Sequence, residues 1–293
     1  MLLKLCQRPL TSRISSLKHW SVYYSSIMMN SSVTNSISSF ETSIDGDKIH
    51  YQSAGNGPHH LLLLPGALGS ATTDFLPQLS KLNGDIFTIH CWDPPGYGKS
   101  RPPNRSWPDK FFNRDATSAA NLIRNLDVGN MSLVGWSDGG ITALVMAVLY
   151  PHLINKMVLF GCNSYITETD VKYIEDIRDV DKWSPRMRAP MEDVYGKEHF
   201  KELWNGWIDA YSSYLTNHDG DIVKERVKEI QHPTLIIHGQ KDALVPQEHP
   251  DYLHSQIANS RLINWPEAKH NLHLKYADEF NELITEFLTK DSS

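Results

Sequence analysis

Residues 131–151 read Met-Ser-Leu-Val-Gly-Trp-Ser-Asp-Gly-Gly-Ile-Thr-Ala-Leu-Val-Met-Ala-Val-Leu-Tyr-Pro, and this stretch decides the fold. Residues 131–134 predict a short buried strand. Residues 141–149 predict an apolar helix, which Pro151 ends because proline cannot continue the hydrogen-bond ladder. Between them lies the pattern G-x-S-x-G, which is typical of a tight strand-to-helix turn that lifts the hydroxyl of Ser137 clear of a sheet.

The length and composition of the chain limit what surrounds this turn. The 293 residues can bury one large core, or a core with an inserted subdomain. The net charge of -6 gives no reason to expect a nucleic-acid partner. The three cysteines are odd in number and unpatterned, so we expect a reducing compartment and no disulfide framework.

Residues 1–38 differ from the rest of the chain. They are rich in serine, contain no acidic residue, and hold no apolar run long enough to span a membrane. Such a basic, serine-rich segment predicts a mitochondrial targeting peptide, and the alternative is a disordered tail on a cytoplasmic protein. The basic residues are Lys4, Arg8, Arg13 and Lys18.

Downstream, predicted strands alternate with predicted helices. Alternation of this kind favours a mostly parallel sheet with helices on both faces, formed here by residues 39–164 and 232–293. We expect strands at 40–44, 48–53, 60–64, 86–92, 131–134, 156–162, 234–238 and 261–265, and helices at 108–126, 141–149, 247–258 and 277–288.

Residues 165–231 break the alternation. They are rich in charge, contain Trp183, Trp204 and Trp207, and have the pattern of consecutive helices. We therefore expect a helical cap, inserted after the sixth strand of the sheet.

Residues 98–100 (Gly-Lys-Ser) superficially suggest a phosphate-binding loop. However, Asp93 stands where that motif requires a glycine, and Pro94 and Pro95 remove two backbone donors that would bind phosphate. We interpret residues 93–100 instead as a structural turn.

A serine at such a turn needs a base and an acid that orients the base. In folds with this turn they follow in the order Ser, Asp or Glu, His. Asp242 follows the predicted strand 234–238, and His270 follows the predicted strand 261–265. The carboxyl ends of parallel strands meet at one edge of a sheet, so we expect Ser137, Asp242 and His270 to form a catalytic triad.

The same chemistry needs donors for the negative oxygen of the tetrahedral intermediate. We expect the backbone N–H groups of Ala67 and Asp138 to supply this oxyanion hole. An acyl-serine intermediate and its hydrolysis by water complete the expected cycle. We expect no cofactor, and no metal site, because His270 and His273 lack a third ligand with metal-binding spacing.

Asp138 limits the class of substrate that we expect. If its backbone N–H serves the oxyanion hole, its carboxylate lies near the developing negative charge. At about 6 Å and an effective dielectric near 20, the two charges repel by roughly 3 kcal/mol. The carboxylate becomes useful if the substrate carries a cation one carbon from its carbonyl, as an α-amino acid ester does. Alternatively, the side chain turns away toward the helix N-terminus, where carboxylates are favoured.

Three stretches, residues 61–70, 135–144 and 266–274, resemble the α/β-hydrolase family, in particular members that hydrolyse esters of α-amino acids, amino-acyl ester prodrugs included. The similarity runs from about Ile44 to the last helix. It implies an α/β-hydrolase fold and a serine hydrolase acting on a small-molecule ester and water. It also implies that the acid after the nucleophile, here Asp138, binds the substrate ammonium.

Three other functions stay open. A carbon–carbon bond hydrolase of ring-cleavage dienoates would use the same triad, but Asp138 would repel its anionic substrates. The others are a generic carboxylesterase and a non-catalytic ligand receptor, and a complete triad disfavours the receptor. We expect the protein to be a monomer.

Overall fold

The computed structural model describes residues 34–290, and residues 1–33 of the predicted targeting segment lie outside them. The first strand, β1, starts at Ile37, two residues before the predicted start of the folded region at residue 39. Asn35 already belongs to it, because its side-chain amide donates to the carbonyl oxygens of Leu79 and Leu82 at 2.9 and 2.7 Å. The targeting role of residues 1–38 stays a prediction.

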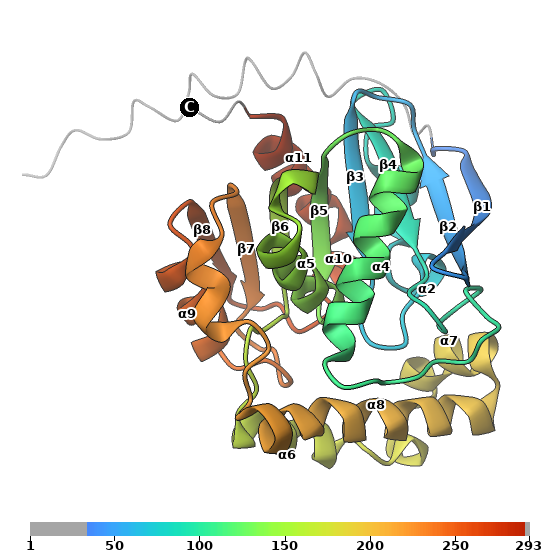
Figure 1. Cartoon of the computed structure of the whole chain (residues 1–293), viewed down its shortest axis with the longest axis vertical. Helices are drawn as coiled ribbons and strands as arrows, with labels where there is room; N and C mark the ends of the chain where they lie inside the picture. The colour runs from blue at the N-terminus through green and yellow to red at the C-terminus, as the bar shows by residue number, and fades with distance from the viewer. Residues whose placement is uncertain (1–33, 291–293) are drawn as a thin grey trace, which may run out of the picture. The chain divides into compact units, whose positions relative to one another are not determined.

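The fold is built on one eight-stranded sheet with the order β1-β2-β4-β3-β5-β6-β7-β8 (Figure 1). Strands β3 to β8 are parallel, whereas β1 and β2 are antiparallel. The strands are β1 (Ile37–Ile44), β2 (Asp47–Ala54), β3 (His59–Leu64), β4 (Phe87–Trp92), β5 (Met131–Trp136), β6 (Ile154–Phe160), β7 (Thr234–Gly239) and β8 (Ser260–Trp265). The predicted mostly parallel sheet is confirmed, and the strand ends lie within two residues of those expected, except that β1 starts three residues earlier.

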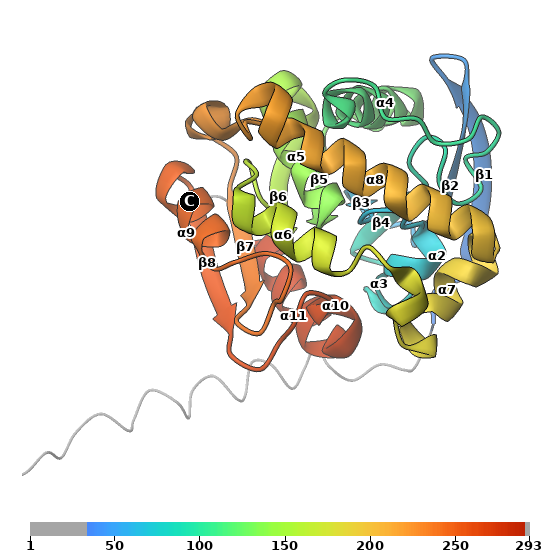
Figure 2. The same cartoon turned by 90° about the horizontal axis from the view of Figure 1, so that it is seen from below.

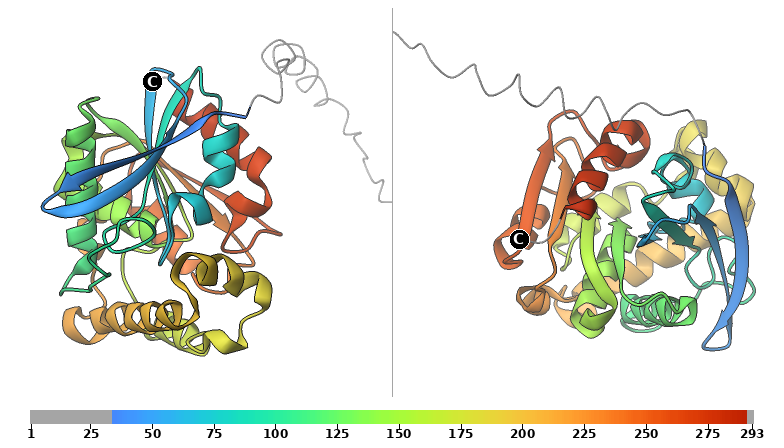
Figure 3. Two further views of the ribbon diagram at one scale, coloured as in Figure 1. Left: turned by 90° about the vertical axis from the view of Figure 1, so that its right-hand side faces the viewer. Right: turned by 90° about the horizontal axis from the view of Figure 1, so that it is seen from above.

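Helices cover both faces of this sheet, because neighbouring residues of a strand point to opposite sides. Leu62 and Leu64 of β3 face one core and Leu61 and Leu63 face the other. Figure 3 shows helices on either side of the twisted sheet. The first core is covered by α4 (Phe111–Leu126), α5 (Asp138–Leu149) and α9 (Glu248–Gln256), and the second by α2 (Ala71–Asp74), α3 (Leu76–Lys81) and α11 (Ala277–Thr289). The short helix α10 (Leu272–Lys275) precedes α11.

Between β6 and β7 the chain forms the helices α6 (Glu168–Asp176), α7 (Pro185–Tyr195) and α8 (Lys197–His218). Figure 2 shows α8 and α6 crossing the carboxyl ends of the strands. We call residues 165–231 the cap. Its inward-facing residues, such as Trp204 and Trp207, join the first core, so the cap packs directly on the sheet region that carries the predicted site.

The turn at residues 93–100 is structural. The buried carboxylate of Asp93 accepts the backbone N–H groups of Ala71 and Lys99 at 2.9 and 2.8 Å and lies 3.0 Å from His50 Nδ1. Gly98 has a φ of +49°, and a Cβ there would lie 2.3 Å from Asp93 Oδ2. One carboxylate thus joins three segments of the chain.

We expect Asp93→Ala to lower the free energy of unfolding by about 3 kcal/mol, because removing the carboxylate leaves buried donors without partners. Urea unfolding of both proteins measures the difference. A variant that unfolds within about 0.5 kcal/mol of wild type would contradict the structural role of this turn.

None of the helices between residues 34 and 290 combines the length and apolar character that a membrane crossing requires. Cys91 and Cys162 are free thiols buried in the core, as expected for small apolar side chains.

Candidate active site

Ser137 stands at the sharp turn between β5 and α5. Its backbone has φ +54° and ψ -123°, a conformation that a non-glycine residue adopts only under constraint from its surroundings. Here the constraint is close packing: a Cβ on Gly139 would lie 1.8 Å from the carbonyl oxygen of Leu64. Helix α5 therefore starts at Asp138, three residues before the predicted start at Ile141, because Gly139 packs against β3 and Gly140 against Cys162 instead of breaking the helix.

Asp242 and His270 are brought together as predicted. His270 Nδ1 lies 2.8 Å from Asp242 Oδ2, and the second carboxylate oxygen accepts the backbone N–H groups of Leu244 and Val245 at 2.9 and 3.1 Å. Burial alone would raise the pKa of Asp242, but His270 and these donors outweigh it, so that pKa lies below its ordinary value. The carboxylate is therefore ionised at neutral pH and fixes the proton of the imidazole on Nδ1.

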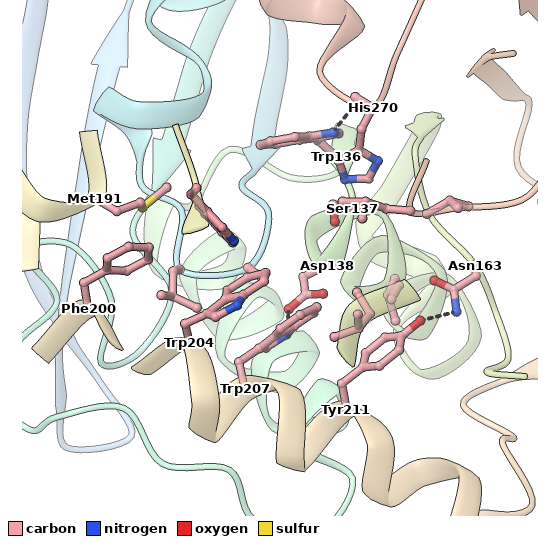
Figure 4. Close-up of a pocket in the computed structure, with 17 residues that line it drawn as sticks. Trp136, Ser137, Asp138, Asn163, Met191, Phe200, Trp204, Trp207, Tyr211 and His270 are labelled. Carbon is pink, nitrogen blue, oxygen red and sulfur yellow. Dashed lines mark hydrogen bonds between the residues drawn. The ribbon is translucent and has the colours of Figure 1, made fainter. Parts of the chain in front are cut away.

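Ser137 and His270 meet at the end of β6. The backbone N–H of Ser137 donates to the carbonyl oxygen of Phe160 at 3.0 Å. The next residue, Gly161, lies against the imidazole, since a Cβ on it would be 3.0 Å from His270 Cε1. Figure 4 shows the ring beside Ser137. No hydrogen bond joins Ser137 Oγ to the ring within the described residues, as is common before substrate binds.

Two aromatic side chains, Trp136 and His273, hold the loop that carries His270. Trp136 Nε1 donates to the carbonyl oxygen of His270 at 2.9 Å, and its ring packs against the imidazole. His273 is buried, and its Nε2 lies 2.9 Å from the carbonyl oxygen of Asp74. Burial lowers the pKa of His273 to about 3, so it stays neutral and serves as a packing residue. No cluster with metal-ligand character occurs in residues 34–290.

The loop of Ala67 is fixed from two sides. From the core, Asp74 Oδ2 accepts the N–H of Gly66 at 2.9 Å, and burial raises the pKa of this carboxyl group to about 7. From the cap, the Tyr195 hydroxyl donates to the carbonyl oxygen of Leu68 at 2.7 Å. The backbone N–H groups of Ala67 and Asp138 donate to no residue in the described range, which leaves both available to a substrate oxygen.

A cavity of about 180 Å³ lies between this loop, Ser137, His270 and the cap (Figure 4). Its cap wall is aromatic: α8 places Trp204, Trp207 and Tyr211 in a row, with neighbouring ring centroids 4.9 and 5.2 Å apart. Such a cavity has room for a small ligand and offers it mainly apolar and aromatic surface.

Asp138 provides the only carboxylate among the residues that line this cavity within the described chain. The residue is 8% exposed, and one oxygen of its side chain, Oδ2, accepts the indole N–H of Trp207 at 2.7 Å. Burial raises the pKa of Asp138 to about 7, although the hydrogen bond from Trp207 and the charge of Arg105 oppose the rise. The carboxylate therefore neither turns back to cap its own helix nor reaches solvent.

Three contributors to the site were not predicted from the sequence: Trp207, Tyr195 and Asp74. Trp207 was noted only as one of several cap tryptophans, and its spacing to Trp204 and Tyr211 on one face of a helix was the available signal. Nothing in the local sequence marks Tyr195 or Asp74.

The family model described as "Alpha/beta hydrolase family" matches residues 61–283. The sheet, the sharp turn at Ser137 between β5 and α5 (the elbow) and the cavity at the strand ends are those of an α/β hydrolase. The chain belongs to this family, and it is a serine hydrolase.

Among curated proteins it is similar to human "Serine hydrolase BPHL", with 49% identity over 86% of this chain and 87% of that protein. The mouse protein of the same name is 48% identical over the same shares. Among solved structures, the 2-hydroxy-6-oxo-6-phenylhexa-2,4-dienoate hydrolase from Rhodococcus sp. strain RHA1 has a TM-score of 0.72 at 18% identity, covering 88% of this chain and all of that chain. This likeness shows the fold alone.

Proposed function

We propose that the protein hydrolyses esters of α-amino acids, with Ser137 as nucleophile, His270 as general base and Asp242 as the acid that orients it. The observation that carries the substrate class is the buried Asp138 carboxylate beside the nucleophile, in a cavity that is otherwise lined mainly by apolar and aromatic groups. A substrate cation one carbon from the scissile carbonyl would meet this carboxylate.

The reaction proceeds in two halves. His270 Nε2 removes the proton of Ser137 Oγ as the oxygen attacks the ester carbonyl, and Asp242 stabilises the imidazolium that results. The backbone N–H groups of Ala67 and Asp138 bind the oxyanion. Collapse expels the alcohol, which takes the proton from His270. Water then attacks the acyl-serine by the same route and releases the amino acid.

Asp138 acts on the α-ammonium in both halves. Its carboxylate lies close to the oxyanion, and the two negative charges would repel each other in a buried site. An ammonium between them reverses this effect, because it attracts both charges. A ring-cleavage dienoate would instead add a further negative charge beside Asp138, which disfavours the carbon–carbon hydrolase alternative.

The test uses two benzyl esters that differ only in the amine, glycine benzyl ester and benzyl acetate. We expect the glycine ester to have a kcat/KM at least about 30-fold higher at pH 7.5, the lower limit for a partly buried ion contact of about 2 kcal/mol. Equal rate constants for the two esters would favour a generic carboxylesterase and remove the proposed specificity.

The ratio of the two kcat/KM values should also depend on pH. Effects of pH on the triad act on both esters equally and cancel in the ratio. Since the pKa of Asp138 is about 7, the ratio should rise between about pH 5.5 and 7.5 as the carboxyl group ionises. Above about pH 8 it should fall, because the substrate amine loses its proton. A ratio that is flat from pH 5.5 to 9 would contradict an ion pair between Asp138 and the amine.

A further inference from the structure

The cavity holds several tryptophans, but all of their polar groups are already used. Trp183 and Trp204 both donate their indole N–H to the carbonyl oxygen of Ile177, at 2.9 and 3.1 Å. Trp207 donates to Asp138. These rings therefore present only carbon to a ligand, so few polar atoms of the cavity wall remain available to it.

One of those atoms is the side-chain oxygen of Asn163, a residue that lines the cavity and is 3% exposed. The side-chain nitrogen Nδ2 donates to the carbonyl oxygen of Tyr165 and to the Tyr211 hydroxyl, the latter at 3.0 Å. Because a carbonyl oxygen can only accept, the first contact fixes which end of the amide is the NH₂ group. Both amide hydrogens are used, and Oδ1 has no partner within the described residues.

The second atom is Asp138 Oδ1, the carboxylate oxygen that Trp207 does not contact. It also lacks a hydrogen-bond partner in the described part of the chain. Asp138 and Asn163 follow adjacent strands, since Trp136 at the end of β5 pairs with Phe160 at the end of β6. Figure 4 shows the Asn163 oxygen on the side of its amide that faces Asp138.

Two acceptors therefore line the cavity on residues that are 3% and 8% exposed, and neither has a donor among the described residues. Polar atoms in such enclosed positions are nearly always hydrogen-bonded to protein or water, and the loss of a partner costs free energy. Both atoms accept and neither donates, so a ligand that satisfies them must bring at least two hydrogen-bond donors, and the charge of Asp138 favours a cation.

We propose that Asn163 is a second recognition residue for the substrate ammonium, accepting one N–H through Oδ1 while Asp138 Oδ1 accepts another. This inference rests on the proposed function and adds to it. The site selects a primary ammonium as a hydrogen-bond donor and discriminates against fully methylated amines of the same charge. Aromatic walls and a carboxylate alone would bind a quaternary ammonium well. Methylation of the amine therefore distinguishes recognition by charge and aromatic contact from recognition by hydrogen bonds.

The experiment measures kcat/KM for four benzyl esters: those of glycine, N,N-dimethylglycine, glycine betaine and acetic acid. The wild-type enzyme should prefer the glycine ester to the betaine ester by at least about tenfold, with the dimethylglycine ester between them, since a hydrogen bond to a charged group is worth about 1.5–3 kcal/mol. This arm needs no variant. Equal kcat/KM values for the betaine ester and the glycine ester would overturn the proposal.

In the variant arm, Asn163→Leu removes the acceptor at similar size. We expect it to lower kcat/KM for the glycine ester by about 10- to 100-fold and for the betaine ester by less than about threefold. Ser164→Ala, in the same segment but outside the cavity lining, should leave the ratio between these esters unchanged. Asn163 also holds Tyr165 and Tyr211, so melting temperatures are recorded for each variant. An equal loss on all four esters would mean that Asn163 only supports the cap, and would overturn the proposal.

The same series separates this proposal from the proposed function. If the wild-type enzyme does not prefer the glycine ester to benzyl acetate, ammonium recognition by Asp138 fails, and the role of Asn163 fails with it. If that preference is present and Asn163→Leu lowers kcat/KM by the same factor for all four esters, recognition by Asp138 stands and only the role of Asn163 is overturned.

Discussion

Ser137→Ala, still folded, should lose at least about 10³-fold in kcat on every ester substrate. The members of a triad act as a unit, so removal of the nucleophile abolishes the acyl-serine route and leaves only the contribution of the oxyanion hole and of substrate binding. His270→Ala should be about as damaging. Asp242→Asn should be somewhat less so, because the imidazole keeps its position but loses the carboxylate that fixes its proton on Nδ1.

Steady-state rates on benzyl acetate and glycine benzyl ester measure these losses, with circular dichroism and melting temperature as controls for folding. Both esters should lose activity by similar factors, because the triad serves the acyl carbonyl and not the amine. A folded Ser137→Ala enzyme that keeps more than a tenth of wild-type activity would show that another residue is the nucleophile.

Asp138→Ala should lower kcat/KM for glycine benzyl ester by about 30- to 1000-fold, which corresponds to a partly buried charge contact of roughly 2–4 kcal/mol. Benzyl acetate should be hydrolysed as well as before or faster, because the change removes a negative charge near the oxyanion and leaves the backbone N–H of the oxyanion hole in place.

Asp138→Asn is the matched control. The amide can still accept the indole N–H of Trp207, which holds the cap to the elbow, but it lacks the charge. Its selectivity should therefore follow that of Asp138→Ala while its melting temperature stays nearer to wild type. If both variants lose activity equally on the two esters, Asp138 supports the structure of the elbow and the proposed specificity must be withdrawn.

The sheet, the elbow and the carboxyl–imidazole pair could be predicted because their causes are local. The dipeptide Asp45-Gly46 between β1 and β2 is typical of a two-residue hairpin turn, and both residues adopt the positive φ that this turn requires. Gly139 marks the elbow because only a residue without a side chain tolerates the approach of β3. Asp242 and His270 follow β7 and β8, two neighbouring parallel strands, and parallel strands bring their carboxyl ends to one edge.

The helix boundaries were less predictable. Helices α2 and α3 were not expected, because four and six residues are too short to show a helical period, and Pro77 stands inside α3. The predicted start of α5 is too late, because glycine is a poor helix former in isolation. In the folded protein, the missing side chain of Gly139 permits the close contact with β3.

The cap contacts could not have been predicted, since they depend on tertiary packing over long sequence separations. Trp207 reaches Asp138 across 69 residues, and Tyr195 reaches Leu68 across 127. For Asn163 the sequence shows only a polar residue after a strand. Its role follows from the two contacts that use its amide hydrogens and leave its oxygen unpartnered.

The most direct test of the account uses a reagent that needs both the nucleophile and the amine site. An α-aminoalkyl phosphonate diphenyl ester resembles an α-amino acid ester, but attack on its phosphorus forms a stable bond to the serine oxygen and expels phenol. We expect one adduct per chain, located by peptide mass spectrometry on Ser137, and a rate of formation at least about 30-fold higher than with the reagent lacking the amine. An adduct on a different residue, or equal rates with and without the amine, would contradict the account.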